Sequence, residues 1–367
     1  VFGSLMYRDT YEGRGKKQLI LLIVALCYDF GVLFLFKYSV FMDKLPLGIS
    51  FYTFQVAAYI IDVYRGRVPV EKSFIRLGTY VTMFPQLIAG PIINYSEVRM
   101  ALCSRTVTFE QFESGLKILI LGLGAKVIVA DRIGLLWNNI QAIGFESIST
   151  PLAWMGAFAY SIELYFDFSG YSLMALGLGR MLGFEFPKNF KHPYISRSVS
   201  EFWRRWHMSL SFWVRDYLYL PLSSGMRRWG QWGVFLSLSL TFAGLGAWHG
   251  AGWNYIIYGL IQGLIIFYEM KTAMIRNKIK NCIGNPLFAT LSILRTYLLF
   301  AFSLIFFRLE SVSDALYYIR NISFSTHASW KEVSIGIPDH NCIVAGSALV
   351  LILVYEYFMS KRDLLEA

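Results

Sequence analysis

The sequence is poor in charged residues, in cysteine and in histidine. Only 16% of its 367 residues are charged, against roughly 25% in soluble domains, which excludes an ordinary soluble globular protein. The four cysteines show no CxxC spacing, so neither a disulfide framework nor a metal site is expected. Because the chain has only five histidines, each position that one of them occupies is informative.

Hydrophobic residues make up 56% of the chain. They gather in runs of about 20 residues with almost no charge, the length that crosses a bilayer as an α-helix. We therefore predict an all-α polytopic membrane protein with a single membrane domain over residues 1–367. The chain begins at Val1 in a polar stretch without a signal-peptide pattern, so the predicted number of spans is a minimum.

The net charge of +10 comes largely from Lys and Arg residues in short loops between the apolar runs. Such loops are typical of the cytoplasmic side of a membrane, so the basic balance indicates topology in a lipid bilayer rather than a nucleic-acid partner. Following the loop charges gives eight spans in a cell membrane, with both chain ends, including the C-terminus, in the cytoplasm. The predicted spans are about 18–40, 47–63, 113–137, 152–178, 233–248, 251–270, 286–307 and 341–359.

The segment 78–95 is apolar but contains the sequence FPQLIAGP (84–91). Proline removes a backbone donor and glycine loosens a helix, so this segment should be broken. Basic loops on both sides of it predict a re-entrant segment that is buried in protein or faces a wet cavity. A kinked ordinary span is the alternative.

Two histidines occupy unusual positions. His249 stands where two short apolar runs meet and is predicted to lie inside the membrane, toward its outer side. His207 ends the run EFWRRWH (201–207) in a basic stretch and is predicted near the cytoplasmic face. An ionisable ring at such a position usually has a function, and two that reach one core from opposite faces suit transfer across it. The alternatives are a hydrogen-bonded structural histidine at 249 and an interfacial histidine at 207.

The stretch around His207 has the pattern of an amphipathic helix. Its large apolar side chains recur at helical spacing, namely Trp203, Trp206, Leu210 and Trp213. Such a helix is predicted to lie along the interface with its rings in the headgroup region. We also expect Arg204, Arg205 and Trp206 to contribute to binding a phosphate-bearing donor, although anchoring alone is the commoner use of such a helix.

Two acidic residues lie within the predicted span 152–178. Glu163 and Asp167 are four residues apart, which places both carboxylates on one face of a helix. Acids at this depth should face the protein interior or a cavity. They are candidates for binding substrate or orienting a histidine, but structural pairing with Arg132 or Arg295 is the favoured interpretation.

Longer stretches of the sequence match a known family. The stretches are LPLGISFYTFQVAAYIIDVYRG (45–66), FPQLIAGPI (84–92), YFDFSGYS (165–172), GLGRMLGFEFPKNFKHPYISRSVSEFWRRWHMSLSFWVRDYLYLPL (177–222), WHGAGWN (248–254) and FFR (306–308). In these stretches the chain resembles the membrane-bound O-acyltransferases (MBOAT), and within them the alginate O-acetylase branch of bacterial cell-surface polysaccharide acyltransferases.

The resemblance implies a ring of tilted transmembrane helices around a thin core, with a re-entrant segment and cytoplasmic interfacial helices, in a bacterial plasma membrane. It implies that His249 is the catalytic histidine and that His207 is a second site histidine on the donor side. The donor would be a cytoplasmic acyl thioester, expected to be acetyl-CoA, and no cofactor would be bound. The sequence departs from the family pattern at Leu173, where an acidic residue is expected, and at 223–226.

The acceptor implied by the resemblance is an extracytoplasmic polysaccharide, reached directly or through an acyltransferase- or esterase-like partner. We expect His249 to act as the base for the acceptor hydroxyl, His207 to position the donor or aid thiolate departure, and Asn254 to supply a hydrogen bond near His249. Two rival functions remain open. One is D-alanine transfer to teichoic acid from a carrier protein, and the other is proton-coupled transport that uses Glu163 and Asp167.

Overall fold

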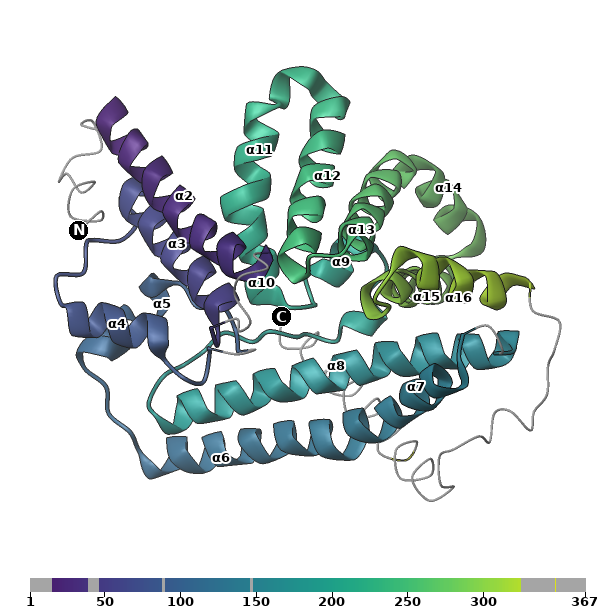
Figure 1. Ribbon diagram of the computed structural model, residues 1–367, viewed down its shortest axis with the longest axis horizontal. Helices are drawn as coiled ribbons and strands as arrows, with labels where there is room; N and C mark the ends of the chain where they lie inside the picture. Colours follow the sequence, from purple (N-terminus) through teal and green to yellow (C-terminus); the bar gives the residue numbers. More distant parts are fainter. Residues whose placement is uncertain (1–14, 39–45, 88–89, 146–147, 325–346, 348–367) are drawn as a thin grey trace. The chain divides into compact units, whose positions relative to one another are not determined.

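The computed structural model describes residues 15–38, 46–87, 90–145, 148–324 and 347. Every regular element in these ranges is a helix, which confirms the all-α prediction for this part of the chain (Figure 1). The elements are α2 (Lys16–Tyr38), α3 (Ile49–Arg65), α4 (Phe74–Thr82), α5 (Tyr95–Cys103), α6 (Phe109–Gly124), η2 (Ala125–Ala130), α7 (Asp131–Ile143), α8 (Thr150–Met181), η3 (Pro193–Ile195), α9 (Val199–Trp203), α10 (Met208–Val214), η4 (Arg215–Tyr219), α11 (Leu220–Gly225), η5 (Arg227–Trp229), α12 (Gly230–His249), α13 (Trp253–Lys271), α14 (Ala273–Ile283), α15 (Asn285–Arg308) and α16 (Val312–Phe324).

The helices follow the apolar runs of the sequence closely. The run 152–178 lies within α8, and the run 286–307 lies within α15. The run 113–137 crosses a continuous helical stretch made of α6, the π-helical turn η2 and α7. The predicted span 341–359 lies outside the described residues.

Length and composition allow two of the described helices, α2 and α15, to cross a membrane by themselves. A third candidate is the pair α13 and α14, which are bent by 64° at the break between them. Other predicted spans do not meet this criterion alone, for instance because α3 has only 17 residues. The eight-span topology and the ring of tilted helices therefore remain predictions.

The chain divides into two compact units. The first consists of the described residues of Val1–Ile120, Ser172–Asn189 and Met208–Pro221, and the second of those of Leu121–Tyr171, Phe190–His207 and Leu222–Ala367. The first unit has an aromatic core in which the rings of Tyr59 and Tyr80 both meet Tyr95 edge-on. Both candidate histidines belong to the second unit.

The described backbone between α4 and α5, residues 83–87 and 90–94, is not helical, as the prolines and glycine of this segment predict. Gln86 is fully buried there, and its Nε2 donates to the carbonyl oxygen of Tyr80 at 2.5 Å. The Tyr80 hydroxyl in turn donates to the carbonyl oxygen of Ile93 at 2.8 Å. Side chains of the first unit thus satisfy a carbonyl oxygen before and one after the break. The re-entrant course of this segment remains a prediction, and residues 88–89 lie outside the described ranges.

In the second unit, α12 and α13 form a closely packed helical hairpin. A Cβ at Gly246 would lie 2.2 Å from the carbonyl oxygen of Tyr255, and a Cβ at Gly259 would lie 2.0 Å from that of Phe242. Only glycine permits this approach, since backbone atoms cannot move aside as a flexible side chain can. The hairpin fixes the end of α12, and this end carries His249.

Candidate active site

His249 is the last residue of α12, immediately before the bend that leads into α13. Its side chain is half-buried, which leaves part of the ring accessible. The ring lies 4.6 Å from that of Trp248 and 5.0 Å from that of Phe307, measured between centroids. His249 therefore stands at the junction of α12, α13 and the end of α15, in an aromatic setting.

Asn254 lies next to this junction and is almost fully buried. Its Nδ2 donates to the carbonyl oxygens of Phe306 at 3.2 Å and Leu309 at 2.8 Å. These carbonyls belong to the end of α15, where helical partners are missing. The structure thus directs the amide N–H groups of Asn254 to the backbone on either side of Phe307. The expected hydrogen bond near His249 stays a prediction.

His207 lies between α9 and α10 and is only 3% exposed. Its backbone has a positive φ of 41°, which few residues other than glycine adopt. Its ring meets that of Phe168 edge-on, with 4.7 Å between the centroids. The histidine is therefore held inside the second unit, rather than standing in an interfacial belt.

The predicted continuous amphipathic helix around His207 is wrong. α9 ends at Trp203 and α10 begins only at Met208. Trp206 is 5% exposed and packs against Phe190 with 5.0 Å between ring centroids, so it does not lie in the headgroup region. Packing of the aromatic rings within the protein outweighs the helical spacing that the sequence shows.

The surroundings of His207 lower its pKa to about 3. Burial of the ring is the larger cause, because it disfavours the charged form, and repulsion from a protonated His249 adds to it. Phe168 beside His207 and Phe307 beside His249 pack against the same hydrophobic core of the second unit. The lowered pKa keeps His207 neutral at physiological pH.

The two acids of α8 have different surroundings. Asp167 pairs with Lys126 of η2, with 2.5 Å between Oδ1 and Nζ, and Lys126 also reaches Asp131 at 3.3 Å. Arg295 pairs with Glu269 instead, so its predicted pairing with the α8 acids is wrong. Glu163 packs against Gly134, where a Cβ would lie 2.9 Å from its carboxyl carbon. Asp167 thus forms an ion pair with Lys126 rather than with the arginines expected from the sequence.

Arg308, which follows the histidine-contacting Phe307, is the cation whose charge acts most on Glu163. Its guanidinium lies over the ring of Trp137 at 5.6 Å and over that of Tyr160 at 5.2 Å. An arginine on aromatic faces is well placed to balance a buried carboxylate. Within the described ranges, no cluster of three or more His, Cys, Asp or Glu side chains could hold a metal ion.

The candidate donor-binding residues differ in accessibility. Arg204 is exposed at the end of α9. Arg205 forms an ion pair with Glu201 at 2.8 Å and donates to the carbonyl oxygen of Lys191 at 3.5 Å. Trp206 is buried in the aromatic core. Arg204 is therefore the more accessible of the two candidate arginines. Arg205 and Trp206 support the local fold.

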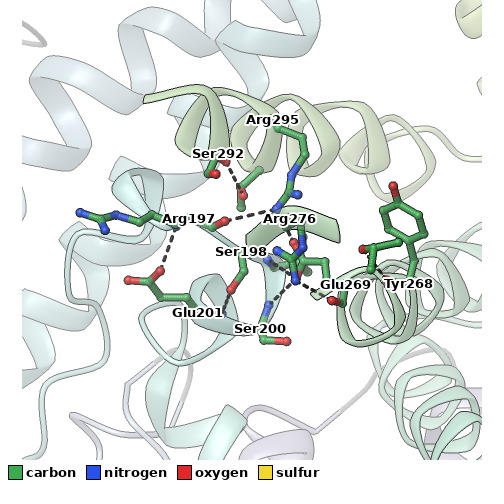
Figure 2. A network of polar contacts seen from close by, with 12 residues as sticks. Arg197, Ser198, Ser200, Glu201, Tyr268, Glu269, Arg276, Ser292 and Arg295 are labelled. Atoms are coloured by element: carbon green, nitrogen blue, oxygen red, sulfur yellow. Dashed lines mark hydrogen bonds and ion pairs between the residues drawn. The ribbon is translucent and has the colours of Figure 1, made fainter. Parts of the chain in front are cut away.

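A buried polar network beside α9 was not predicted from the sequence. Figure 2 shows Glu269 of α13 between Arg295 of α15 and the first residues of α9. Its carboxylate accepts from the Arg295 guanidinium at 2.6 Å and from the backbone N–H of Val199 at 2.9 Å. The signal in the sequence is Glu269 itself, an acidic residue inside the apolar run 251–270.

Comparison with known families agrees with the all-helical fold of the described residues. The sequence model of the MBOAT, membrane-bound O-acyltransferase family matches residues 68–309, which include both histidines. The chain belongs to this family. The match extends over most of the described helices and ends at Leu309, one of the two residues whose carbonyl oxygens accept from Asn254.

Three curated relatives show the range of the family near this chain. The chain is 46% identical over 225 residues to the probable alginate O-acetylase AlgI of Pseudomonas putida, covering 61% of this chain and 46% of that protein. It is 33% identical over 311 residues to a peptidoglycan O-acetyltransferase of Helicobacter pylori, covering 72% and 58%. It is 32% identical over 229 residues to a teichoic acid D-alanyltransferase of Bacillus subtilis, covering 60% and 58%. The chain spans about half the length of the curated relatives it matches.

Proposed function

We propose that this chain forms the catalytic membrane part of an O-acetyltransferase for a cell-surface polysaccharide. It would take an acetyl group from a cytoplasmic thioester, acetyl-CoA, and deliver it to an extracytoplasmic hydroxyl, as in alginate O-acetylation. Membership of the O-acyltransferase family and the likeness to proteins named alginate O-acetylase support the reaction class. The observation that carries the proposal is the placement of a buried His207 and a more accessible His249 beside one hydrophobic core of the second unit.

His249 is proposed as the general base. A hydroxyl becomes an effective nucleophile when a neutral imidazole nitrogen takes its proton, and histidine is suited to this near neutral pH. The hydroxyl oxygen then bonds to the thioester carbonyl carbon, the carbon–sulfur bond breaks, and the thiolate leaves and takes up the proton. The half-buried ring at the end of α12 leaves room for an acceptor to approach.

His207 is proposed as the donor-side histidine. Because its pKa is lowered to about 3, it remains neutral and offers a ring N–H or a lone pair rather than a charge. A neutral, rigidly held ring can orient the thioester by a hydrogen bond without attracting bulk anions. Arg204, which is exposed directly after the last residue of α9, supplies a cation for the donor phosphates.

D-alanine transfer is a second candidate, favoured by the likeness to proteins named teichoic acid D-alanyltransferase. The two functions share the histidine chemistry and differ in the donor. Binding of acetyl-CoA, compared with binding of a carrier protein loaded with D-alanine, distinguishes them. The transporter hypothesis loses its main support, because Asp167 is neutralised by Lys126 and the family is one of acyltransferases.

The proposal is tested by a His249→Ala variant expressed in cells that acetylate their surface polymer. We expect loss of polymer acetylation at normal protein levels in the membrane. His192→Asn is the matched control, since it removes another histidine of the second unit, and Asn tolerates its positive φ of 48°. Acetylation at the wild-type level in the His249→Ala variant would exclude His249 as the base.

A further inference from the structure

The helix α9 is too short to hold itself in place. It has only five residues, and its first backbone N–H groups have no helical partners. The Ser198 hydroxyl accepts from the N–H of Glu201 at 3.0 Å, while the N–H groups of Val199 and Ser200 point to Glu269 at 2.9 and 3.4 Å. A carboxylate from another helix therefore caps the start of α9.

This carboxylate is itself held by a half-buried arginine. Glu269 is 3% exposed, and its second oxygen accepts from the Arg295 guanidinium at 2.6 Å. Arg295 also donates to the carbonyl oxygen of Arg197 at 3.2 Å, just before α9 begins (Figure 2). Arg276 donates to the main-chain oxygen of Glu269 at 2.5 Å. The start of α9 is thus tied to α13 and α15 through charged hydrogen bonds, which are the stronger kind.

The end of α9 is tied to the same two helices by neutral groups. The indole N–H of Trp203, the last residue of α9, donates to Gln262 Oε1 at 3.2 Å. The Gln262 Nε2 then donates to the Ser303 hydroxyl at 2.7 Å, and both of these residues are fully buried. This second connection repeats the order of the first, from α9 to α13 to α15.

The spacing of the two connections matches the geometry of α13. Gln262 and Glu269 are seven residues apart, which is close to two helical turns, so they share one face. One face of α13 therefore holds both ends of α9. The chain leaves α9 at Trp203 and reaches His207 four residues later, with the N–H of Trp206 still bonded to the carbonyl oxygen of Phe202 at 2.8 Å. Any shift of α9 would move His207 with it.

We propose that Glu269 and Gln262 are positioning residues for His207, acting through the two ends of α9. The proposal rests on the proposed function, because it gives these residues a part in placing the donor-side histidine. The cost of removing Glu269 from water offsets much of its attraction to Arg295, so the role we assign to the pair is to fix one arrangement of α9. The charged connection sets where α9 begins, and the neutral connection sets the direction in which it continues toward His207.

The test is a double-mutant cycle on the protein reconstituted in nanodiscs. Glu269→Gln keeps the shape of the side chain but removes the charge that binds Arg295, and Gln262→Met removes the neutral connection without introducing a charge. Each is made in the wild-type protein and in a His207→Asn background, since Asn tolerates the positive φ there. The readouts are kcat/KM for acetyl-CoA consumption and the dissociation constant of a non-hydrolysable acetyl-CoA thioether.

We expect each substitution to lower kcat/KM and weaken thioether binding by about tenfold in the wild-type background, since small displacements are costly in a catalytic site. In the His207→Asn background, the same substitutions should change thioether binding less than twofold. Glu113→Gln is the matched control, because Glu113 pairs with Lys117 on an exposed helical face, and it should change neither readout.

Equal losses in both backgrounds would overturn the proposal, because they would show that the connections support the fold in general rather than His207. Unchanged activity in both variants would overturn it as well. If Glu269→Gln fails to fold, Gln262→Met decides the matter alone. Failure of the proposed function would be seen in a different experiment, because the His249→Ala variant would then retain acetyl transfer.

Discussion

The ring of His249 meets the ring of Phe307 edge-on, with 5.0 Å between the centroids and 85° between the planes. This contact joins the end of α12 to the end of α15. Asn254 fixes the backbone on either side of Phe307 through the carbonyl oxygens of Phe306 and Leu309. The orientation of the proposed base therefore depends on Phe307, whose side chain takes no part in the reaction.

Replacing Phe307 by Leu should lower acetyl transfer about tenfold, because a less constrained His249 spends less time in the reactive orientation. The cost in stability should be below about 1.5 kcal/mol, as for other hydrophobic exchanges of similar volume. Phe302→Leu, on the same helix, is the control and should leave the rate near that of the wild type. Steady-state rates with acetyl-CoA are the measurement. Equal rates for the two variants would show that Phe307 does not orient His249 for the reaction.

Asn254→Leu should destabilise the protein by about 2 kcal/mol, because it leaves two buried carbonyl oxygens without their donor. Thermal unfolding in detergent measures the effect. Asn281→Leu on the exposed helix α14 provides a control with the same chemical change. An unchanged unfolding temperature for Asn254→Leu would show that the end of α15 is held by other contacts.

Burial of His207 predicts that stability depends on pH. Its pKa is lowered from an ordinary 6.5 to about 3 in the folded protein, so the unfolded chain binds the proton more readily. The contribution of the neutral His207 ring to folding stability is fully present above pH 6.5, and it is lost progressively as the pH falls toward 3. Between pH 7 and pH 5 the loss should be about 2 kcal/mol.

The measurement for this pH effect is the unfolding temperature of the wild type and of His207→Asn at several pH values. The variant lacks the titrating ring and should lose less stability on acidification than the wild type. Identical slopes for the two proteins between pH 7 and pH 5 would contradict the burial of a neutral His207.

The glycine contact in the α12–α13 hairpin predicts a further effect on activity. Gly246→Ala would place a Cβ 2.2 Å from the carbonyl oxygen of Tyr255, so the two helices must separate next to His249. Gly31→Ala in α2 is the matched control, because a Cβ there meets nothing within 4 Å, and alanine favours a helix by about 0.5–1 kcal/mol. We expect loss of transfer and lower stability for Gly246→Ala only, as measured by rate and unfolding temperature.

Much of the helical architecture follows from the sequence, because apolar runs determine where long helices form in a membrane protein. The runs 233–248 and 251–270 correspond closely to α12 and α13. The break between α4 and α5 follows from its prolines and glycine for the same local reason. The two histidines stand out in the sequence by their rarity and setting, and the structure places each beside a ring that packs on the same core.

What the sequence could not supply depends on contacts between distant residues. Helical spacing from Trp203 to Trp213 is real, but aromatic packing and the left-handed backbone of His207 divide the segment in two. The partners of Glu269 lie about 70 and 26 residues away along the chain. Local patterns carry no information on such pairs, so pairing of Asp167 with Lys126 and of Arg295 with Glu269 required the structure.

The central claim is that His249 enables transfer of an acetyl group from a cytoplasmic thioester to an acceptor across the membrane. The most direct measurement uses sealed inside-out vesicles that contain the protein, with polysaccharide acceptor enclosed and labelled acetyl-CoA added outside. We expect label on the enclosed acceptor with the wild type and none above background with His249→Ala. Equal labelling by the two proteins would contradict the account.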